Sequence, residues 1–414
     1  MTILHEILRS LNNSLIRDGT HTKTPEESRV QMFFSLASES GVGILPPQKL
    51  GKAKRRIQIR VRRMCMQTGR QFFTQARLVL VILLLCLSSA CHRASAGSTI
   101  KPATSVLEME PIPRTPERLA RGKYLVEGLV QCPFCHSDYD FTHRPATPVP
   151  GRKNGGHVFS NDEMGLPAPN RVVASNISPD PDYGAGKWKD ADFVRALRQG
   201  IGHDGRTLYP MMPYAYFRNL SDEDLASVIV YERSLAPVHI VRPKTILTDD
   251  IKKMFQPLSP VNHVPEPDKS DRLAYGKYLV TVGHCDGCHT PVDEQGNPIP
   301  GMEFAGGQPL IGAWGPDPNK IIAVTSLNLT PDPSGISYFD EHMFINTIRS
   351  GKVAARPLAN IMPWAYFRNL TDDDLEAIFA YLRTLKPVQH RVDNTEVARL
   401  CKLCRGKHGF GDRN

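Results

Sequence analysis

The chain has 414 residues, 41% of them hydrophobic, which is enough for two or three domains with ordinary cores. Its formal charge of +9 belongs to the start of the chain, because residues 1–77 hold 14 of the 51 Lys and Arg but 5 of the 42 Asp and Glu. The remainder is neutral and contains no basic stripe with interleaved aromatic residues. This distribution excludes nucleic acid as a predicted partner.

An export signal is predicted over residues 64–96. Residues 78–87 form an apolar run of ten, and a helix of that length covers only about half of a bilayer core of roughly 30 Å. The run is therefore interpreted as a signal-peptide core, with two open routes: cleavage after Ala96 or lipid attachment at Cys91. Both predict a periplasmic protein, and a lipid on Cys91 or an uncleaved signal would anchor it to the membrane.

More than sixty residues precede this signal, whereas export signals normally begin near the start of a chain. Met64 and Met66 lie just ahead of the apolar run. We therefore expect one of these methionines to be the natural start, with residues 1–63 a non-native or disordered extension. Residues 97–112, rich in Ser, Thr and Pro, are expected to be a linker.

One five-residue pattern occurs twice: Cys132-Pro-Phe-Cys135-His136 and Cys285-Asp-Gly-Cys288-His289. Two thiols at this spacing can add to the two vinyl groups of one haem, and the adjacent histidine then becomes the proximal ligand of the iron. A pair of cysteines at this spacing can also be a redox disulfide or half of a zinc site. The adjacent histidine and the repetition favour haem, so two covalently bound haem c groups are predicted.

The two motifs lie within a longer internal repeat. The matching segments are Arg118–Val126 with Arg272–Val280, Asn176–Asp180 with Asn328–Asp332, and Met212–Leu220 with Met362–Leu370. We therefore expect two tandem domains of one fold. Their predicted bounds are residues 113–243 for the first, 244–265 for the linker, 266–390 for the second and 391–414 for a C-terminal tail.

Each copy is predicted to be all-α around a long irregular middle. A first helix should start at Thr115 and run to about Leu129, and later helices should cover residues 190–199 and 340–350, ending at Gly200 and Gly351. Final helices should start at Ser221 and Thr371, and Thr248 can begin a short helix in the linker. The middles, about residues 137–189 and 290–339, are rich in Pro, Gly and Asn, and loops of this length are expected to wrap a haem.

The sixth iron ligand is predicted to be methionine in both copies. Met212 lies 76 residues after His136, and Met362 lies 73 residues after His289. A methionine is more often a core residue, but the matched positions favour Met212 and Met362 as axial ligands, which raise the reduction potential. Met211 competes in the first copy, whereas Ile361 occupies its counterpart.

Both copies resemble class I cytochrome c domains, and in particular the cytochrome c subunits of membrane-bound alcohol and gluconate dehydrogenases. The resemblance covers about residues 115–390. Besides the Cys-x-x-Cys-His motifs, it rests on Asn176–Asp180 leading to Trp188, on Gly205–Pro210, on Met212–Tyr214 and on Leu220–Leu225. It implies that the first and last helices cross beside the haem, where Gly122 and Gly276 would allow close approach; alternatively they only weaken the helix, by about 1 kcal/mol each.

Such subunits typically carry three haem motifs, whereas this chain has two. The remaining pair, Cys401 and Cys404, has no histidine directly after it, and His408 follows at a distance. A local disulfide is favoured there over part of a metal site. Arg206 and Arg356, just upstream of the methionines, are either partners of haem propionates or surface residues.

These features predict a dihaem cytochrome c of the respiratory chain that carries electrons between a dehydrogenase and an oxidase or other cytochrome. An electron carrier is favoured over an enzyme. Two alternatives stay open: a haem enzyme, such as a dihaem peroxidase or thiosulfate-oxidising cytochrome, and a cytochrome subunit permanently bound to a dehydrogenase.

Overall fold

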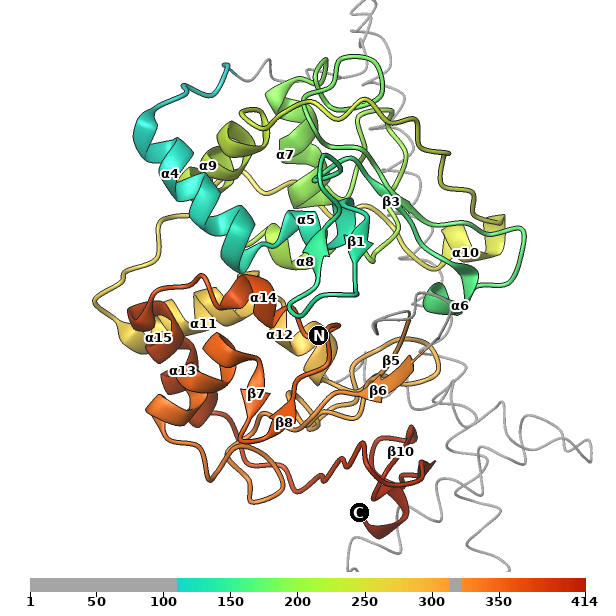
Figure 1. Ribbon diagram of the computed structural model, residues 1–414, viewed down its shortest axis with the longest axis vertical. Coiled ribbons are helices and arrows are strands. Elements are labelled where there is room, and N and C mark those ends of the chain that lie inside the picture. The colour runs from blue at the N-terminus through green and yellow to red at the C-terminus, as the bar shows by residue number, and fades with distance from the viewer. Residues whose placement is uncertain (1–109, 313–321) are drawn as a thin grey trace, which may run out of the picture. The chain divides into compact units, whose positions relative to one another are not determined.

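The computed structural model describes residues 110–312 and 322–414, which belong to a unit bounded by Ser105 and Asn414. Within them are twelve α-helices (Figure 1): α4 Pro116–Tyr124, α5 Cys132–His136, α6 Asn161–Met164, α7 Asp190–Gln199, α8 Tyr214–Phe217, α9 Asp222–Glu232, α10 Asp249–Lys253, α11 Arg272–Val282, α12 Cys285–His289, α13 Glu341–Ser350, α14 Trp364–Phe367 and α15 Asp372–Arg383. A π-helical turn, η2, covers Leu125–Leu129, and a 3₁₀ turn, η3, covers Gly411–Arg413.

The expected helical class is confirmed, but the described residues also contain five short antiparallel strand pairs, three of them in the segments expected to be irregular. The pairs are β1 Tyr139–Asp140 with β2 Thr147–Pro148, β3 His157–Val158 with β4 Val173–Ala174, β5 Pro309–Gly312 with β6 Ile322–Thr325, β7 Lys352–Val353 with β8 Arg356–Pro357, and β9 Arg399–Leu400 with β10 Lys407–His408. Sequence periodicity misses strands of two to four residues. They form because backbone groups taken out of water need hydrogen-bond partners.

Local signals in the sequence set the helix ends. The Thr115 side chain accepts a hydrogen bond from the Arg118 N–H at 3.2 Å, and the helix continues through the π-helical turn to Leu129, as predicted. Helices α7 and α13 end before Gly200 and Gly351, whose φ angles of 71° and 66° favour glycine.

The final helices begin as expected after capping residues. Ser221 caps α9 and Thr371 caps α15, and each hydroxyl accepts a hydrogen bond from the N–H three residues later. Acidic residues fill both first turns, where the helix dipole favours them. The short helix α10 follows Thr248.

First and last helices cross closely in each half of the chain. Helix α4 packs on α9, and helix α11 packs on α15. A Cβ atom at Gly122 would lie 2.7 Å from the Ser227 carbonyl carbon, and one at Gly276 would lie 2.7 Å from the Ala377 carbonyl carbon. Both glycines therefore permit a close crossing, and the expectation that they do so is confirmed.

The two helix pairs exchange hydrogen bonds reciprocally. The Tyr124 hydroxyl of α4 donates to the Asp374 carboxylate of α15 at 2.6 Å, and the Tyr278 hydroxyl of α11 donates to the Asp224 carboxylate of α9 at 2.6 Å. Each tyrosine oxygen also accepts the N–H of the residue that caps the partner's final helix. The same contact is thus made twice with the halves interchanged.

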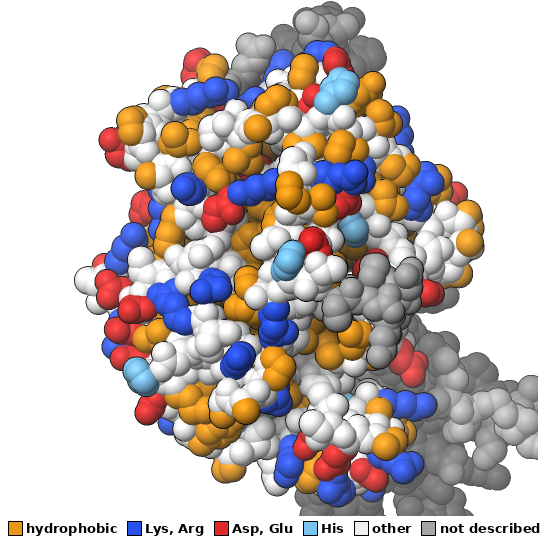
Figure 2. Space-filling model, in the orientation of Figure 1, with side chains coloured by type: hydrophobic (Ala, Val, Ile, Leu, Met, Phe, Trp, Pro, Cys, Tyr) orange, Lys and Arg blue, Asp and Glu red, His pale blue; other side chains and the backbone are white. Residues whose placement is uncertain are grey.

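A single hydrophobic cluster runs through both halves. It includes Leu125 and Leu129 from the first half and Leu279 and Leu375 from the second, all at most 1% exposed. Figure 2 shows acidic and basic side chains interspersed on the visible face, as the neutral composition of this part of the chain predicts.

Several expectations lie outside the described residues. These are the extension over residues 1–63, the signal over 64–96 with Cys91, and nearly all of the linker over 97–112. Within the described ranges, none of the helices has the length and apolar character that a membrane crossing requires.

Candidate functional site

Each Cys-x-x-Cys-His motif forms its own short helix. The preceding residues, Gln131 and His284, have φ angles of 49° and 45°, in the left-handed region, so the chain turns sharply between the first helix of each half and the motif helix. The sequence predicted that the first helix leads directly to the motif. The structure shows a turn between them, so α5 and α12 are helices separate from the first helix of each half.

Both motif histidines donate a hydrogen bond through Nδ1 to a backbone carbonyl. His136 donates to Ser175 and His289 donates to Leu327, each at 2.7 Å. A carbonyl oxygen only accepts, so Nδ1 carries the proton and Nε2 carries the lone pair. This arrangement is typical of metal-binding histidines. Burial also lowers the pKa of both rings, which favours the neutral, ligating form.

The segment after each motif is held by matching contacts. The Ser137 hydroxyl accepts the Asn154 N–H at 2.9 Å, and the Thr290 hydroxyl accepts the Phe304 N–H at 3.0 Å. In addition, the carbonyl oxygens of the two motif histidines accept backbone N–H groups of glycines, at 2.8 Å and 2.7 Å. The loops are therefore fastened directly to the motif helices.

The four motif cysteines are free thiols. Burial raises the pKa of Cys135 and Cys285 to about 12 and that of Cys288 to about 11, and it raises the pKa of Cys132 strongly. Redox-active Cys-x-x-Cys pairs instead have a lowered pKa, because their function needs a thiolate. Within the described ranges, neither pair lies in a group of three or more potential metal-binding side chains, whereas Cys401 and Cys404 do.

Met212 and Met362 occupy matching places, each two residues before a short helix, α8 or α14. Both are half-buried and pack against the hydrophobic cluster, as Cys132 and Cys285 also do. The Met212 carbonyl accepts the Tyr214 N–H and the Met362 carbonyl accepts the Trp364 N–H, both at 2.8 Å. Their role as iron ligands stays a prediction.

The two motif helices lie in different halves of the molecule, α5 above and α12 below in Figure 1, and side chains at the two sites meet across the boundary between the halves. The Gln131 and His284 side chains, which directly precede the motifs, are hydrogen-bonded at 3.0 Å. Phe134 of the first motif contacts Tyr366 of the second half, with ring centroids 6.2 Å apart. The pKa of Cys135 is raised first by burial and then by the neighbouring Cys288. The tertiary structure thus brings together two sites that are 153 residues apart in sequence.

One buried polar pair distinguishes the first site from the second. Asn154 donates to the Glu232 carboxylate at 2.6 Å, and burial raises the pKa of Glu232 to about 7, with Cys132 and Asn154 as hydrogen-bond partners. Phe304 and Leu382 occupy the corresponding positions in the second half. Sequence analysis missed Glu232, although a carboxylate in the otherwise apolar face of the last helix was a visible signal.

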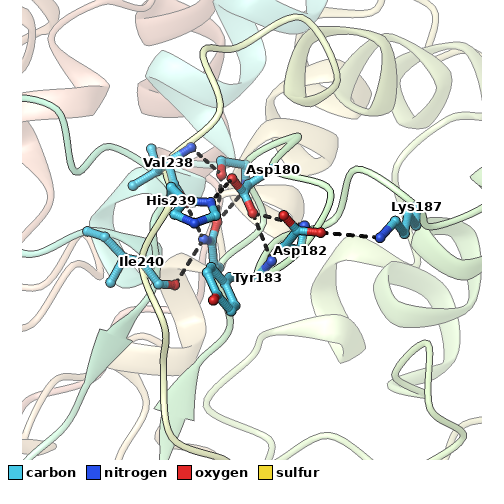
Figure 3. A network of polar contacts seen from close by, with 9 residues as sticks. Asp180, Asp182, Tyr183, Lys187, Val238, His239 and Ile240 are labelled. Atoms are coloured by element: carbon cyan, nitrogen blue, oxygen red, sulfur yellow. Dashed lines mark hydrogen bonds and ion pairs between the residues drawn. The ribbon is translucent and has the colours of Figure 1, made fainter.

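The Asn-x-Ser/Thr turns, which occur once in each half, connect the loops to the segment after each final helix. Asn176 Nδ2 donates to the Val238 carbonyl at 2.7 Å, and Asn328 Nδ2 donates to the Val388 carbonyl at 2.8 Å. In the first half, Asp180 extends this network: its carboxylate accepts the Tyr183 N–H and the His239 ring N–H, at 2.7 Å and 2.9 Å (Figure 3).

The two arginines expected near propionates differ in placement. Arg206 contacts the Ser175 hydroxyl at 3.3 Å and pairs with Asp204 at 2.5 Å, so it lies beside the segment that binds His136. Arg356 is exposed on β8. The structure therefore places only Arg206 close to a motif histidine's hydrogen-bond partner.

The favoured disulfide in the tail is wrong. Cys401 and Cys404 are both free and buried, and they lie together with His408 and His390. The fourth residue was missed because His390 lies eleven residues before Cys401, at the end of the second predicted domain. Only folding brings it to the tail.

Comparison with known proteins places these motifs among cytochromes. No protein-family model matches the chain. It is 30% identical over 317 residues to the cytochrome c subunit of a quinone alcohol dehydrogenase from Gluconacetobacter polyoxogenes, covering 69% of this chain and 60% of that protein. It is 29% identical over 290 residues to the gluconate 2-dehydrogenase cytochrome c subunit of Pantoea cypripedii, covering 64% and 59%.

A third relative is a dihaem cytochrome c-type protein of Cereibacter sphaeroides, 29% identical over 232 residues, which cover 52% of this chain and 72% of the relative. The chain spans about 60% of the length of the two dehydrogenase subunits. Cytochrome c relatives imply covalently bound haem c. The chain is thus a homologue of the cytochrome c subunits of quinone alcohol and gluconate dehydrogenases and of a dihaem c-type cytochrome.

Proposed function

We propose that the chain is a dihaem c-type cytochrome that transfers electrons between a dehydrogenase and a respiratory acceptor such as an oxidase or another cytochrome. In this proposal two tandem cytochrome c-like domains, residues 113–243 and 266–390, each carry one haem. The observation that carries it is the pair of adjacent Cys-x-x-Cys-His helices, each with its histidine oriented by a hydrogen bond from Nδ1 to a backbone carbonyl.

The described residues fit this cofactor. Cys132 and Cys135 would hold one haem and Cys285 and Cys288 the other, since all four are unpaired thiols. His136 and His289 present the Nε2 lone pair that a proximal ligand needs. Met212 and Met362 would be the sixth ligands. When bound, haem supplies an iron that accepts and releases one electron.

The chain's own contribution is to keep the two sites adjacent and to make them different. The Gln131–His284 hydrogen bond and the reciprocal tyrosine–carboxylate contacts hold the two halves together. The buried Glu232 is close to the first site alone, and a carboxylate near a haem stabilises the oxidised, more positive state. Ionisation of Glu232 should therefore lower the reduction potential of the first haem.

The predicted export signal and the names of the relatives support a proposed location for the protein. The protein would work in the periplasm, with a lipid on Cys91 or an uncleaved signal as its membrane tether. The relatives' names support a dehydrogenase as electron donor. A transient partner would need only a small docking patch.

A redox titration of the full chain, produced with a haem-attachment system, tests the proposal. We expect a mass two haems above that of the polypeptide and two one-electron transitions. Met212→His and Met362→His should each lower one of the two potentials, because methionine ligation raises the potential. Met211→Leu is the matched control and should change neither. A colourless protein, or potentials unchanged in both histidine variants, would contradict the proposal.

A second candidate role is a cytochrome subunit permanently bound to a dehydrogenase, which the printed names of the relatives favour. Tagged protein purified from native membranes distinguishes the two roles. A stoichiometric flavoprotein or quinoprotein that stays bound in high salt would indicate a fixed subunit. Release of the partner in salt would indicate a carrier.

A further inference from the structure

The C-terminal tail brings four metal-binding side chains to one buried point. They are His390, Cys401, Cys404 and His408, and their ligand atoms all lie within 4.8 Å of one another. All four residues are at most 2% exposed. We propose that this group is a structural zinc site with a Cys₂His₂ ligand set, separate from both haem motifs.

The distances match a tetrahedral ion. Zinc binds cysteine sulfur at about 2.3 Å and histidine nitrogen at about 2.0 Å, so neighbouring sulfur and nitrogen ligands lie roughly 3.5 Å apart. Cys401 Sγ lies 3.5 Å from His390 Nε2, and Cys404 Sγ lies 3.4 Å from His408 Nε2. Each sulfur therefore already has a ring nitrogen at the separation of a tetrahedral edge.

Both histidines present the nitrogen that a metal needs. His390 donates through Nδ1 to the Ala305 carbonyl at 2.8 Å, and His408 donates through Nδ1 to the Gly409 carbonyl at 2.9 Å. The Nε2 atoms, which carry the lone pairs, are the ones that lie beside the sulfurs. Such hydrogen bonds from the second ring nitrogen are typical of histidine ligands to zinc.

The backbone is shaped to hold the two cysteines as one ligand unit. Strands β9 and β10 form a hairpin, and Cys401 and Cys404 occupy its turn. The Cys401 N–H donates to the Gly406 carbonyl at 2.8 Å, and Arg405 has a φ of 61°. The turn therefore brings both cysteine sulfur atoms close to the His390 ring.

The ligand chemistry selects zinc over other metals. Two thiolates and two imidazoles in a closed, buried tetrahedral site are typical of structural zinc. An iron–sulfur cluster with the same residues would hold its histidines and its cysteines on different irons. In this site each sulfur instead has a ring nitrogen beside it.

The site would fasten the tail to the loop that follows the second haem motif. Met302 and Ala305 form a small buried cluster with the two cysteines. Glycine at 307 permits the contact, because a Cβ atom there would lie 2.7 Å from His390 Cε1. The next residue back, Gly306, donates its N–H to the His289 carbonyl at 2.7 Å. Zinc would thus support the loop beside α12.

Metal analysis of the full chain tests this inference independently of haem. We expect one zinc per chain after exhaustive dialysis, and X-ray absorption at the zinc edge should show two sulfur and two nitrogen ligands. The double variant C401S/C404S should bind less than a tenth of this zinc. H408C, which keeps four zinc ligands, should retain it, and H342N is the control for an exposed histidine.

A second readout covers the structural role. Trypsin cleavage within residues 391–414 should become at least tenfold faster when zinc is removed by a chelator, and added zinc should restore protection. Circular dichroism should confirm that the double variant keeps its helices. A disulfide between Cys401 and Cys404 in the purified protein, zinc retained by the double variant, or iron in place of zinc at this site would overturn the proposal.

Discussion

Replacing Gly122 or Gly276 by alanine tests how closely the helices cross, because the close crossing should turn the usual stabilising effect of Gly→Ala into a destabilising one. In an unhindered helix, Gly→Ala stabilises a protein by about 1 kcal/mol. At position 122, however, the new Cβ would lie 2.7 Å from both the Ser227 carbonyl carbon and the Tyr231 Cβ, whereas carbon atoms pack at about 3.5 Å or more. The obstacle is largely backbone, which no rotamer change can relieve.

The Ser227 carbonyl oxygen lies closer still. Helices α4 and α9 would therefore have to separate by at least about 0.8 Å, the shift that restores normal contacts between the carbon atoms alone. Overpacking of this kind costs up to about 3 kcal/mol. After subtracting the gain in helix propensity, we expect Gly122→Ala to lower the free energy of unfolding by about 2 kcal/mol. Gly276→Ala should behave alike, because its Cβ would lie 2.7 Å from the Ala377 carbonyl carbon.

Urea unfolding followed by circular dichroism measures the effect. Lys123→Ala is the matched control, since Lys123 is the next residue on the same helix and is exposed. It should change the free energy of unfolding by less than about 0.5 kcal/mol. If Gly122→Ala proved as stable as the unmodified protein, or more so, the glycines would only soften their helices and the reasoning about the crossing would be refuted.

Three further predictions concern buried polar groups. Because burial raises the pKa of Glu232 to about 7 in the folded protein, the free energy of unfolding should fall by about 3 kcal/mol as pH rises from 4.5 to 7. Over the same range the reduction potential of the first haem should fall by at most about 59 mV per pH unit. In urea and redox titrations across pH, Glu232→Gln should remove both trends, whereas the control Glu294→Gln should remove neither. Asn328→Ala should cost about 2–3 kcal/mol in urea unfolding, because it leaves buried backbone groups unpaired, whereas the exposed Asn346→Ala should not. Tyr278→Phe should cost about 1.5 kcal/mol by removing a hydrogen bond to a carboxylate between the halves; an unchanged denaturation midpoint would count against that contact.

Much of the helical structure could be predicted because its signals are local. Thr115, Ser221 and Thr371 cap helices through their own side chains, and Gly200 and Gly351 end them through their φ angles. The short strand pairs were missed, since strands of two to four residues are too short to show a clear alternation of polar and apolar residues.

The motif residues of the candidate sites could be listed from the sequence, but their surroundings could not. Nothing in the order of residues indicates that the carbonyls of Ser175 and Leu327 accept hydrogen bonds from the motif histidines, or that Gln131 meets His284. These partners lie 38 to 153 residues apart. They meet only because the helix pairs cross and the loops fold back on them.

By itself the sequence determined the two Cys-x-x-Cys-His motifs, the class of the helices and the likeness to c-type cytochromes, because spacing and capping act over a few residues. Only the tertiary structure decided that the motifs are neighbours, that Glu232 is buried beside the first of them, and that His390 completes a group of four ligands with the tail cysteines. The physical reason is the same in each case: burial and proximity depend on how distant segments pack, and local sequence does not encode that packing in a readable form.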